Sequence, residues 1–422
     1  MEKIFLRLAL VFCFFTSNSL AFAATSPLQQ RAQEITFFFS AQPKGFEKVF
    51  AGGFLAAVPP AKLAEVFSDY FRRLGPCLGM EEGKQENFNF LFKEAKVPAK
   101  ITLDSKEPGL VGGFWLGNPT SNSKSLGGVV EDFKKLPGKV SFSLRHIESK
   151  ESKEMISLNP REELAIGSAF KLYLLGTLTD QIASGKRKWT DIVPLQEKSI
   201  SLPSGILQAW PAGSPLTLYT LAGLMISISD NTATDHLLSL LGRQQVEKEL
   251  KEMGHSAPNL NSPFLSTLEM FKLKGIPGEA EKFLATDEKG RRRFLDKEVA
   301  GLERSRIDFP KKPTHIADIE WFASADDLCS AMEALWRKSE KGPAQATRGI
   351  LAINPGLKFD ESKWSYVGYK GGSEPGVLNM TYLLHSRKGD WYLLSAGWND
   401  PGAPLDEGRF FGLMQRIEEL IP

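Results

Sequence analysis

The stretch IGSAFK at residues 166–171 is the part of the sequence that indicates the fold most strongly. Apolar residues follow it at helical spacing as far as Ile182, and Gly185 ends the pattern, so the stretch is predicted to begin a helix. A spacing of three on a helix places the Ser168 hydroxyl and the Lys171 amine on one face, within hydrogen-bond reach. A lysine can take the proton of a nucleophilic hydroxyl when burial or a neighbouring cation lowers the lysine pKa.

The pattern Ser-x-x-Lys is weak evidence by itself, because the chain contains a second copy at residues 121–124. That copy lies in a turn-forming stretch, where no helix fixes the two side chains relative to each other. At the start of the predicted helix, the backbone N–H of Ser168 is expected to point to where an oxyanion would develop. Ser168 and Lys171 are therefore the candidate nucleophile and general base.

A second candidate motif, Ser229-Asp230-Asn231, lies between two apolar helical stretches. One interpretation is a helix cap, for which all three residue types are favourable. The other interpretation is catalytic: Ser229 passes a proton towards the leaving group, and Asn231 holds an amide of the substrate. The motif alone leaves both interpretations open.

A third candidate motif, YKGGS at residues 369–373, follows a predicted strand and precedes a return strand. One interpretation is a hairpin turn. In the other, Lys370 supplies a positive field that lowers the pKa of Lys171 and attracts a substrate carboxylate. The backbone N–H groups of Ser168 and Ser373 would then form an oxyanion hole.

The three motifs, in this order, resemble those of class A β-lactamases and penicillin-binding proteins, which are serine hydrolases. The resemblance runs from about Val140 to the C-terminus and implies an antiparallel sheet flanked by helices, with an all-helical part. It also implies roles for individual residues. Ser168 is the acylated nucleophile, Lys171 its base, Ser229 a proton relay and Lys370 the cationic partner, and the substrate-binding residues are Asn231, Tyr369, Gly371 and Ser373.

The sequence departs from this family pattern in two ways. Gly371 stands where β-lactamases usually have Thr or Ser, so a hydroxyl that binds the carboxylate of the antibiotic is absent, although Ser373 could partly replace it. No clear residue activates water for deacylation, because Glu269 lacks the surrounding family pattern and is predicted to be a helix surface residue. Without such a base, water attacks the acyl-enzyme slowly.

A length of 422 residues predicts two domains. We expect a small α+β domain over residues 24–137 and the hydrolase domain over residues 138–422. In the first, a helix over residues 63–74 precedes short strands. With this domain included, the chain resembles two-domain proteins related to a clavulanic acid cluster product, whose first domain is similar to the NTF2 or steroid isomerase fold.

The hydrolase domain is expected to build its sheet from both ends. Strands are predicted over residues 140–147 at its start and over residues 364–369, 377–385 and 391–398 near its end. A long helical section runs between them to about residue 255, and a final amphipathic helix closes the chain. The charged stretch over residues 275–313 is expected to be a solvated insertion.

Residues 1–23 are interpreted as a cleavable signal peptide. Lys3 and Arg7 precede an apolar run, and Ala21-Phe22-Ala23 has small residues at the spacing of a cleavage site. The rival interpretation is a membrane anchor, but the apolar run is shorter than the roughly 20 residues that a span needs. A periplasmic or secreted protein with no stable membrane span after cleavage is therefore expected.

Composition offers no sign of a metal, a cofactor or a nucleic-acid partner. The five histidines are scattered, Cys77 and Cys329 lie too far apart in sequence to indicate a disulfide framework, and the net charge is +2. The sequence thus predicts a serine hydrolase that acts through an acyl-enzyme on a small-molecule β-lactam, ester or amide. The alternatives are a peptidoglycan D-Ala-D-Ala carboxypeptidase and a ligand-binding regulatory protein without turnover, and the oligomeric state stays open.

Overall fold

The computed structural model describes residues 26–84, 86–149 and 151–422, so the predicted signal peptide lies outside the described residues. The chain divides into two compact units, residues 1–117 and 118–422. The boundary predicted near residue 137 therefore falls too late. Helix α4 (Leu126–Phe133) buries its apolar side in the same core as helix α14 (Glu407–Leu420), and this packing places residues 118–137 in the second unit.

The first unit consists of helices followed by an antiparallel meander in the order β1-β2-β3-β4. The elements are α1 (Pro27–Thr36), α2 (Gly52–Ala57), α3 (Pro60–Leu74), β1 (Gly79–Glu82), β2 (Asn87–Leu91), β3 (Ala95–Leu103) and β4 (Val111–Leu116). Helix α3 begins with a proline in its first turn and ends before Gly75, close to the predicted helix. The core is rich in phenylalanine, because alternate residues of β2, Phe88 and Phe90, meet the helices there.

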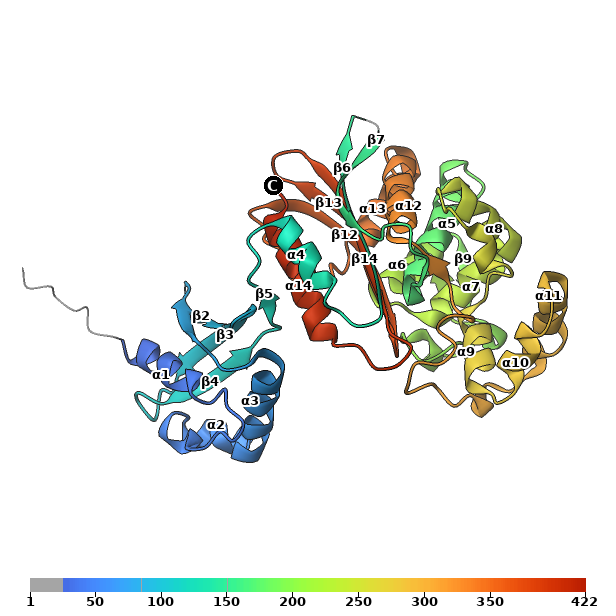
Figure 1. Ribbon diagram of the computed structural model, residues 1–422. Coiled ribbons are helices and arrows are strands. Elements are labelled where there is room, and N and C mark those ends of the chain that lie inside the picture. Colours follow the sequence, from blue (N-terminus) through green and yellow to red (C-terminus); the bar gives the residue numbers. More distant parts are fainter. Residues whose placement is uncertain (1–25, 85, 150) are drawn as a thin grey trace, which may run out of the picture. The chain divides into compact units, whose positions relative to one another are not determined.

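The second unit is built on a five-stranded antiparallel sheet in the order β12-β13-β14-β6-β7. Its strands are β6 (Lys139–Glu148), β7 (Glu151–Leu158), β12 (Trp364–Glu374), β13 (Val377–Ser386) and β14 (Trp391–Asn399). The predicted assembly of a sheet from both ends of the domain is therefore present. Helices α4 and α14 cover one face, and the larger helical part covers the other (Figure 1). Strand β12 lies at the edge of the sheet.

Helix α5 (Lys171–Ala183) lies at the centre of the helical part. Almost every residue from Lys171 to Ile182 is buried, the polar Thr177, Thr179 and Gln181 included, because other elements surround the helix. The surrounding helices are α6 (Leu218–Ser227), α7 (Asn231–Leu241), α8 (Arg243–Glu252), α9 (Thr267–Gly275), α12 (Ala325–Lys338) and α13 (Ala346–Leu351). Short strands complete the unit: β5 (Thr120–Ser121), β8 (Leu164–Ala165), β9 (Ile192–Pro194), β10 (Pro215–Thr217) and β11 (Phe322–Ala323).

The charged stretch over residues 275–313 is more structured than a solvated insertion. It forms α10 (Glu279–Leu284) and α11 (Glu288–Lys297). Phe283, Phe294 and Leu295 are buried in the core of the helical part. Across the described part of the chain, no helix combines the length and apolar character needed to cross a membrane.

Candidate active site

Ser168 and Lys171 lie at the start of α5. A 3-10 turn over Gly167–Phe170 leads into the helix, whereas the sequence predicted that the helix itself begins here. In a 3-10 turn residues three apart eclipse each other, so the two side chains still meet. The Nζ atom of Lys171 lies 3.1 Å from the Oγ atom of Ser168.

Lys171 is fully buried and has four oxygen neighbours. Besides Ser168 Oγ, its Nζ lies 2.7 Å from Ser229 O, 2.7 Å from Asn231 Oδ1 and 3.0 Å from Ser229 Oγ. Two of these, Ser229 O and Asn231 Oδ1, can only accept hydrogen bonds. The orientation of the Asn231 amide follows from the network, because its Nδ2 donates to the Leu202 carbonyl oxygen at 3.0 Å.

Burial lowers the pKa of Lys171 well below its usual value, and the charge of Lys370 lowers it further. The sequence predicted the effect of Lys370, but burial is the larger cause. A neutral amine has two N–H donors and one lone pair. Because the two carbonyl-type acceptors take both donors, the lone pair is left for a hydroxyl proton of Ser168 or Ser229.

The motif at residues 229–231 joins α6 to α7. Ser229 has a φ of 58°, a left-handed conformation that is costly for a residue other than glycine. Asp230 caps α7 through Ala233 N at 2.8 Å and also accepts from Ile206 N at 2.7 Å. The cap interpretation is therefore confirmed at Asp230, while Ser229 and Asn231 face Lys171. The proton relay at Ser229 stays a prediction, and so does the substrate contact of Asn231, whose Oδ1 and Nδ2 both bond to protein groups in this structure. Sequence analysis gave Asp230 no role of its own, although its cap preference was the available signal.

Lys370 approaches the site from β12. Its Nζ lies 3.2 Å from Ser229 Oγ and also donates to the Gly371 carbonyl oxygen, and burial lowers its pKa to about 7. The hairpin-turn interpretation of Lys-Gly-Gly is wrong, because β12 continues to Glu374. The glycines instead permit close packing: a Cβ atom at Gly372 would lie only 2.0 Å from the Ile166 carbonyl oxygen.

This packing brings the end of β12 beside the 3-10 turn. A Cβ atom built on Gly167 would lie 3.0 Å from the Ser373 backbone nitrogen, and one built on Gly372 would lie 2.5 Å from the Ser168 nitrogen. The two N–H groups predicted for the oxyanion hole are thus on neighbouring segments. A cleft of about 340 Å³ runs along them and is lined by Ser168, Ser229, Asn354, Tyr369, Lys370, Gly371, Ser373, Glu407 and Phe411, among others.

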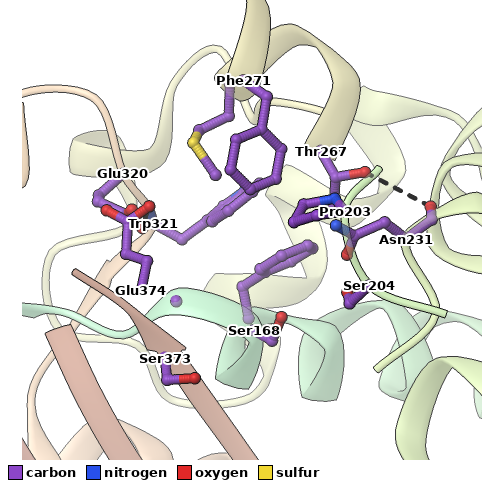
Figure 2. Close-up of a pocket in the computed structure, with 13 residues that line it drawn as sticks. Ser168, Pro203, Ser204, Asn231, Thr267, Phe271, Glu320, Trp321, Ser373 and Glu374 are labelled. Atoms are coloured by element: carbon purple, nitrogen blue, oxygen red, sulfur yellow. Dashed lines mark hydrogen bonds between the residues drawn. The ribbon is translucent and has the colours of Figure 1, made fainter. Parts of the chain in front are cut away.

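A smaller pocket of about 90 Å³ opens on the other side of Ser168. Figure 2 shows Glu320 and Glu374 on one side of Ser168, and Asn231 and Thr267 on the other. Lys274 binds both carboxylates, with its Nζ 2.7 Å from Glu320 Oε1. Burial and the charge of Glu320 raise the pKa of Glu374 to about 9, so it holds its proton at neutral pH. Sequence analysis missed all three residues.

Glu269 does not line either pocket. It forms a capping box with Ser266 at the start of α9 and an ion pair with Arg243 at 2.7 Å. The residues of α9 that reach the smaller pocket are Thr267, Met270 and Phe271, none of which can act as a carboxylate base. Within the described residues, the carboxylates that line the two pockets are Glu320, Glu374 and Glu407.

The second Ser-x-x-Lys copy has no comparable geometry. Ser121 donates to Asp132 Oδ2 at 2.6 Å, and Lys124 is exposed. Cys77 and Cys329 are both free cysteines. His255 lies close to Glu163 and Asp327, but its ring nitrogens meet Phe322 O at 2.7 Å and Ala257 N at 3.1 Å, so this histidine has protein partners.

Solved structures and one family description are similar to parts of this chain. Three similar solved structures are a β-lactamase from Sphaerobacter thermophilus (21% identity, 70% of this chain and 97% of that chain, TM-score 0.49), PBP-A (14%, 69% and 92%, 0.50) and a β-lactamase from Chitinophaga pinensis (17%, 69% and 96%, 0.48). At 14% identity the likeness to PBP-A concerns the fold alone. No curated protein matches the sequence significantly. The family description "Beta-lactamase enzyme family" matches residues 124–354, more than half of the chain, and the protein therefore belongs to this family of serine hydrolases.

Proposed function

We propose that this protein is an exported serine hydrolase that forms an acyl-enzyme on Ser168 and acts on β-lactams, esters or related amides. The observation that carries the proposal is the hydrogen-bond pattern of Lys171. Its two N–H donors are taken by Ser229 O and Asn231 Oδ1, and its lowered pKa leaves a lone pair beside Ser168 Oγ. A buried neutral lysine in this position is a general base for a serine nucleophile.

Acylation then proceeds in two proton transfers. Lys171 takes the proton of Ser168, and the Oγ atom bonds to the substrate carbonyl carbon, whose oxygen becomes an oxyanion held by the N–H groups of Ser168 and Ser373. As the bond from that carbon to the leaving nitrogen or oxygen breaks, the leaving atom takes the Ser229 hydroxyl proton. Lys171, which lies 3.0 Å from Ser229 Oγ, returns the proton to Ser229.

Hydrolysis of the acyl-enzyme is the slower half of the proposed cycle. It requires a water molecule and a base on the side of the smaller pocket, where α9 presents only Thr267, Met270 and Phe271. Glu374 holds its own proton at neutral pH, and Glu320 is paired with Lys274, so neither is a free base. We therefore expect β-lactams to accumulate as adducts and to be hydrolysed weakly.

The proposal also covers location and the first unit. The Lys3 to Ala23 segment has the composition of a signal peptide, which supports export to the periplasm or beyond. The helices and antiparallel meander of the first unit, with their aromatic core, support an NTF2-like fold and a relationship to the two-domain proteins of the clavulanic acid type.

A substrate panel on the wild type and Ser168→Ala tests the proposed function. Nitrocefin, short acyl esters and D-Ala-D-Ala peptides would be assayed for product release, and intact mass spectra would record adducts. Ser184→Ala, at the other end of α5, is the matched control because Ser184 bonds only to backbone oxygens of its own helix. Adducts and product that vanish in Ser168→Ala and persist in Ser184→Ala support the proposal.

Three other outcomes would contradict the proposal or assign one of its alternatives. If folded Ser168→Ala keeps the adduct or the activity of the wild type, the nucleophile is another residue. Product from D-Ala-D-Ala peptides alone would assign a carboxypeptidase. A stable adduct with every compound and no product would assign a capturing protein.

A further inference from the structure

We infer that the Tyr369 hydroxyl is a substrate-binding group that donates a hydrogen bond to a carboxylate on the leaving-group side of the substrate. This inference rests on the proposed function and adds a substrate feature to it. It starts from Gly371, which leaves the third motif without a side-chain hydroxyl at that position.

The aromatic ring of Tyr369 is held in a narrow slot. A Cβ atom at Gly356 would lie 2.4 Å from Tyr369 Cε1, so only a glycine at residue 356 leaves room for the ring. Tyr382 of β13 stacks against the ring, with the ring centroids 4.8 Å apart. Since both neighbours restrict the ring, the direction of the hydroxyl is fixed.

The fixed hydroxyl lies directly over Gly371. Residues two apart in a strand share a face, so Tyr369 and Gly371 lie on the same side of β12. A Cβ atom at Gly371 would lie 2.1 Å from the Tyr369 hydroxyl oxygen. The phenol therefore fills the space that a side chain at residue 371 would use, and it places a hydroxyl where Gly371 has none.

This hydroxyl is available to a ligand. It lines the 340 Å³ cleft together with Ser168 and Lys370, and among the residues that the structure describes it has no hydrogen-bond partner. Burial raises the pKa of Tyr369 to about 12, so the group remains a donor at neutral pH. Tyr369 is partly buried and its hydroxyl oxygen is not fully enclosed, so a ligand acceptor in the cleft can take the place of water there.

The chemistry around the hydroxyl favours a carboxylate. Lys370 Nζ bonds to the Gly371 carbonyl oxygen, and the Tyr369 hydroxyl occupies the position of a Cβ atom at residue 371, so an amine and a neutral donor both lie next to residue 371. Lys370 is the single basic residue of the cleft among those described. A carboxylate that binds to both donors would orient the substrate across Ser168.

The test compares benzylpenicillin with its methyl ester, which differ in the carboxylate. Second-order acylation rate constants would be measured by intact mass for the wild type, Tyr369→Phe and Tyr382→Phe. Tyr382→Phe is the matched control because the Tyr382 hydroxyl is buried, has no hydrogen-bond partner among the described residues and does not line either pocket. For Tyr369→Phe we expect a loss of about tenfold or more with benzylpenicillin, typical of a hydrogen bond to a charged group, and a change of less than about twofold with the ester. Tyr382→Phe should follow the wild type with both compounds.

Equal rate constants for Tyr369→Phe and the wild type, or equal losses with both compounds, would overturn the inference while leaving the proposed function intact. A wild-type protein that neither compound acylates would overturn both. A second comparison uses Gly371→Thr, which should acylate poorly beside Tyr369 but should raise the benzylpenicillin rate constant when introduced into Tyr369→Ala. If Gly371→Thr lowers the benzylpenicillin rate constant equally in the wild type and in Tyr369→Ala, the hydroxyl groups of residues 369 and 371 do not occupy the same place in the cleft.

Discussion

Gly372 and Ser168 are in direct backbone contact, since a Cβ atom added to Gly372 would lie 2.5 Å from the Ser168 nitrogen. The contact joins the edge strand β12 to the turn that carries the nucleophile. Two groups of the site depend on it, because Lys370 and Ser373 lie within two residues of Gly372 and reach the site only when β12 lies this close. The distance between the first and the third motif is thus determined by a glycine, which has no side chain.

Gly372→Ala should abolish acylation without altering any group that takes part in chemistry. The added methyl group would also lie 2.0 Å from Ile166 O, a backbone atom that cannot swing away, so β12 must move from the turn. We expect a loss of at least about 100-fold in the rate of labelling by a fluorescent penicillin, in line with the cost of misplacing reacting groups. The control is Gly127→Ala in α4, where a Cβ atom meets nothing within 4 Å. Labelling of Gly372→Ala at the wild-type rate would contradict the contact.

Lys171→Ala should reduce acylation by roughly 10² to 10⁴, the usual contribution of a general base. The two acceptors Ser229 O and Asn231 Oδ1 would lose their donor, so a fall in the thermal midpoint is expected as well. Lys124→Ala is the matched control, because Lys124 belongs to the second Ser-x-x-Lys copy and is exposed. Similar labelling rates in the two folded variants would remove Lys171 from the role of base.

The candidate catalytic residues were predictable from the sequence, because their residue types form recognisable motifs. Ser168, Lys171, Ser229 and Lys370 stand in motifs whose residue types are unusual together, and the structure brings the four into one network. The sheet was also predictable, because its strands are apolar runs separated by short turns that contain glycine, although β13 and β14 are buried almost continuously since both faces of the sheet are covered. The position of the domain boundary was not. Helix α4 packs on α14 near the other end of the chain, and no local pattern reports such a contact.

The missed residues share a physical reason. Lys274 and Glu374 are 100 positions apart, and each alone resembles an ordinary charged surface residue. Only folding shows that they are buried and paired beside Ser168. Lys-Gly-Gly was ambiguous for a related reason, since glycine serves both tight turns and close packing, and the neighbour that decides between them is remote in sequence.

The pH dependence of acylation should differ between anionic and neutral substrates. Lys171 must be neutral to act as a base, so rates with both benzylpenicillin and its methyl ester should fall as pH falls through the lowered pKa of Lys171. Lys370 has a pKa of about 7 and loses its charge as pH rises through that value. The rate with benzylpenicillin alone should then decline above neutral pH. Rate constants from pH 5 to 9 for both compounds test this, and parallel profiles above pH 7 would contradict an electrostatic role for Lys370.

Glu374→Gln should make the protein less sensitive to alkaline pH. The pKa of Glu374 is raised to about 9 in the folded protein, above the usual carboxyl value that applies to the unfolded chain. Between those values the folded state holds a proton that the unfolded state has released, so the free energy of unfolding falls as pH rises, by up to about 1.4 kcal/mol per pH unit. Above the folded pKa the penalty stops growing. The glutamine side chain does not titrate, so Glu374→Gln should remove this dependence of the free energy of unfolding on pH.

Thermal midpoints at pH 6, 7, 8 and 9 would measure the effect. The thermal midpoint of Glu374→Gln minus that of the wild type should increase with each step in pH, because only the wild type loses stability through this group. Glu407→Gln serves as a control from the opposite pocket, since Glu407 has no charged partner that the described structure records. A difference that stays constant from pH 6 to 9 would mean that Glu374 is already ionised and paired with Lys274 in the folded protein, and the raised pKa would be contradicted.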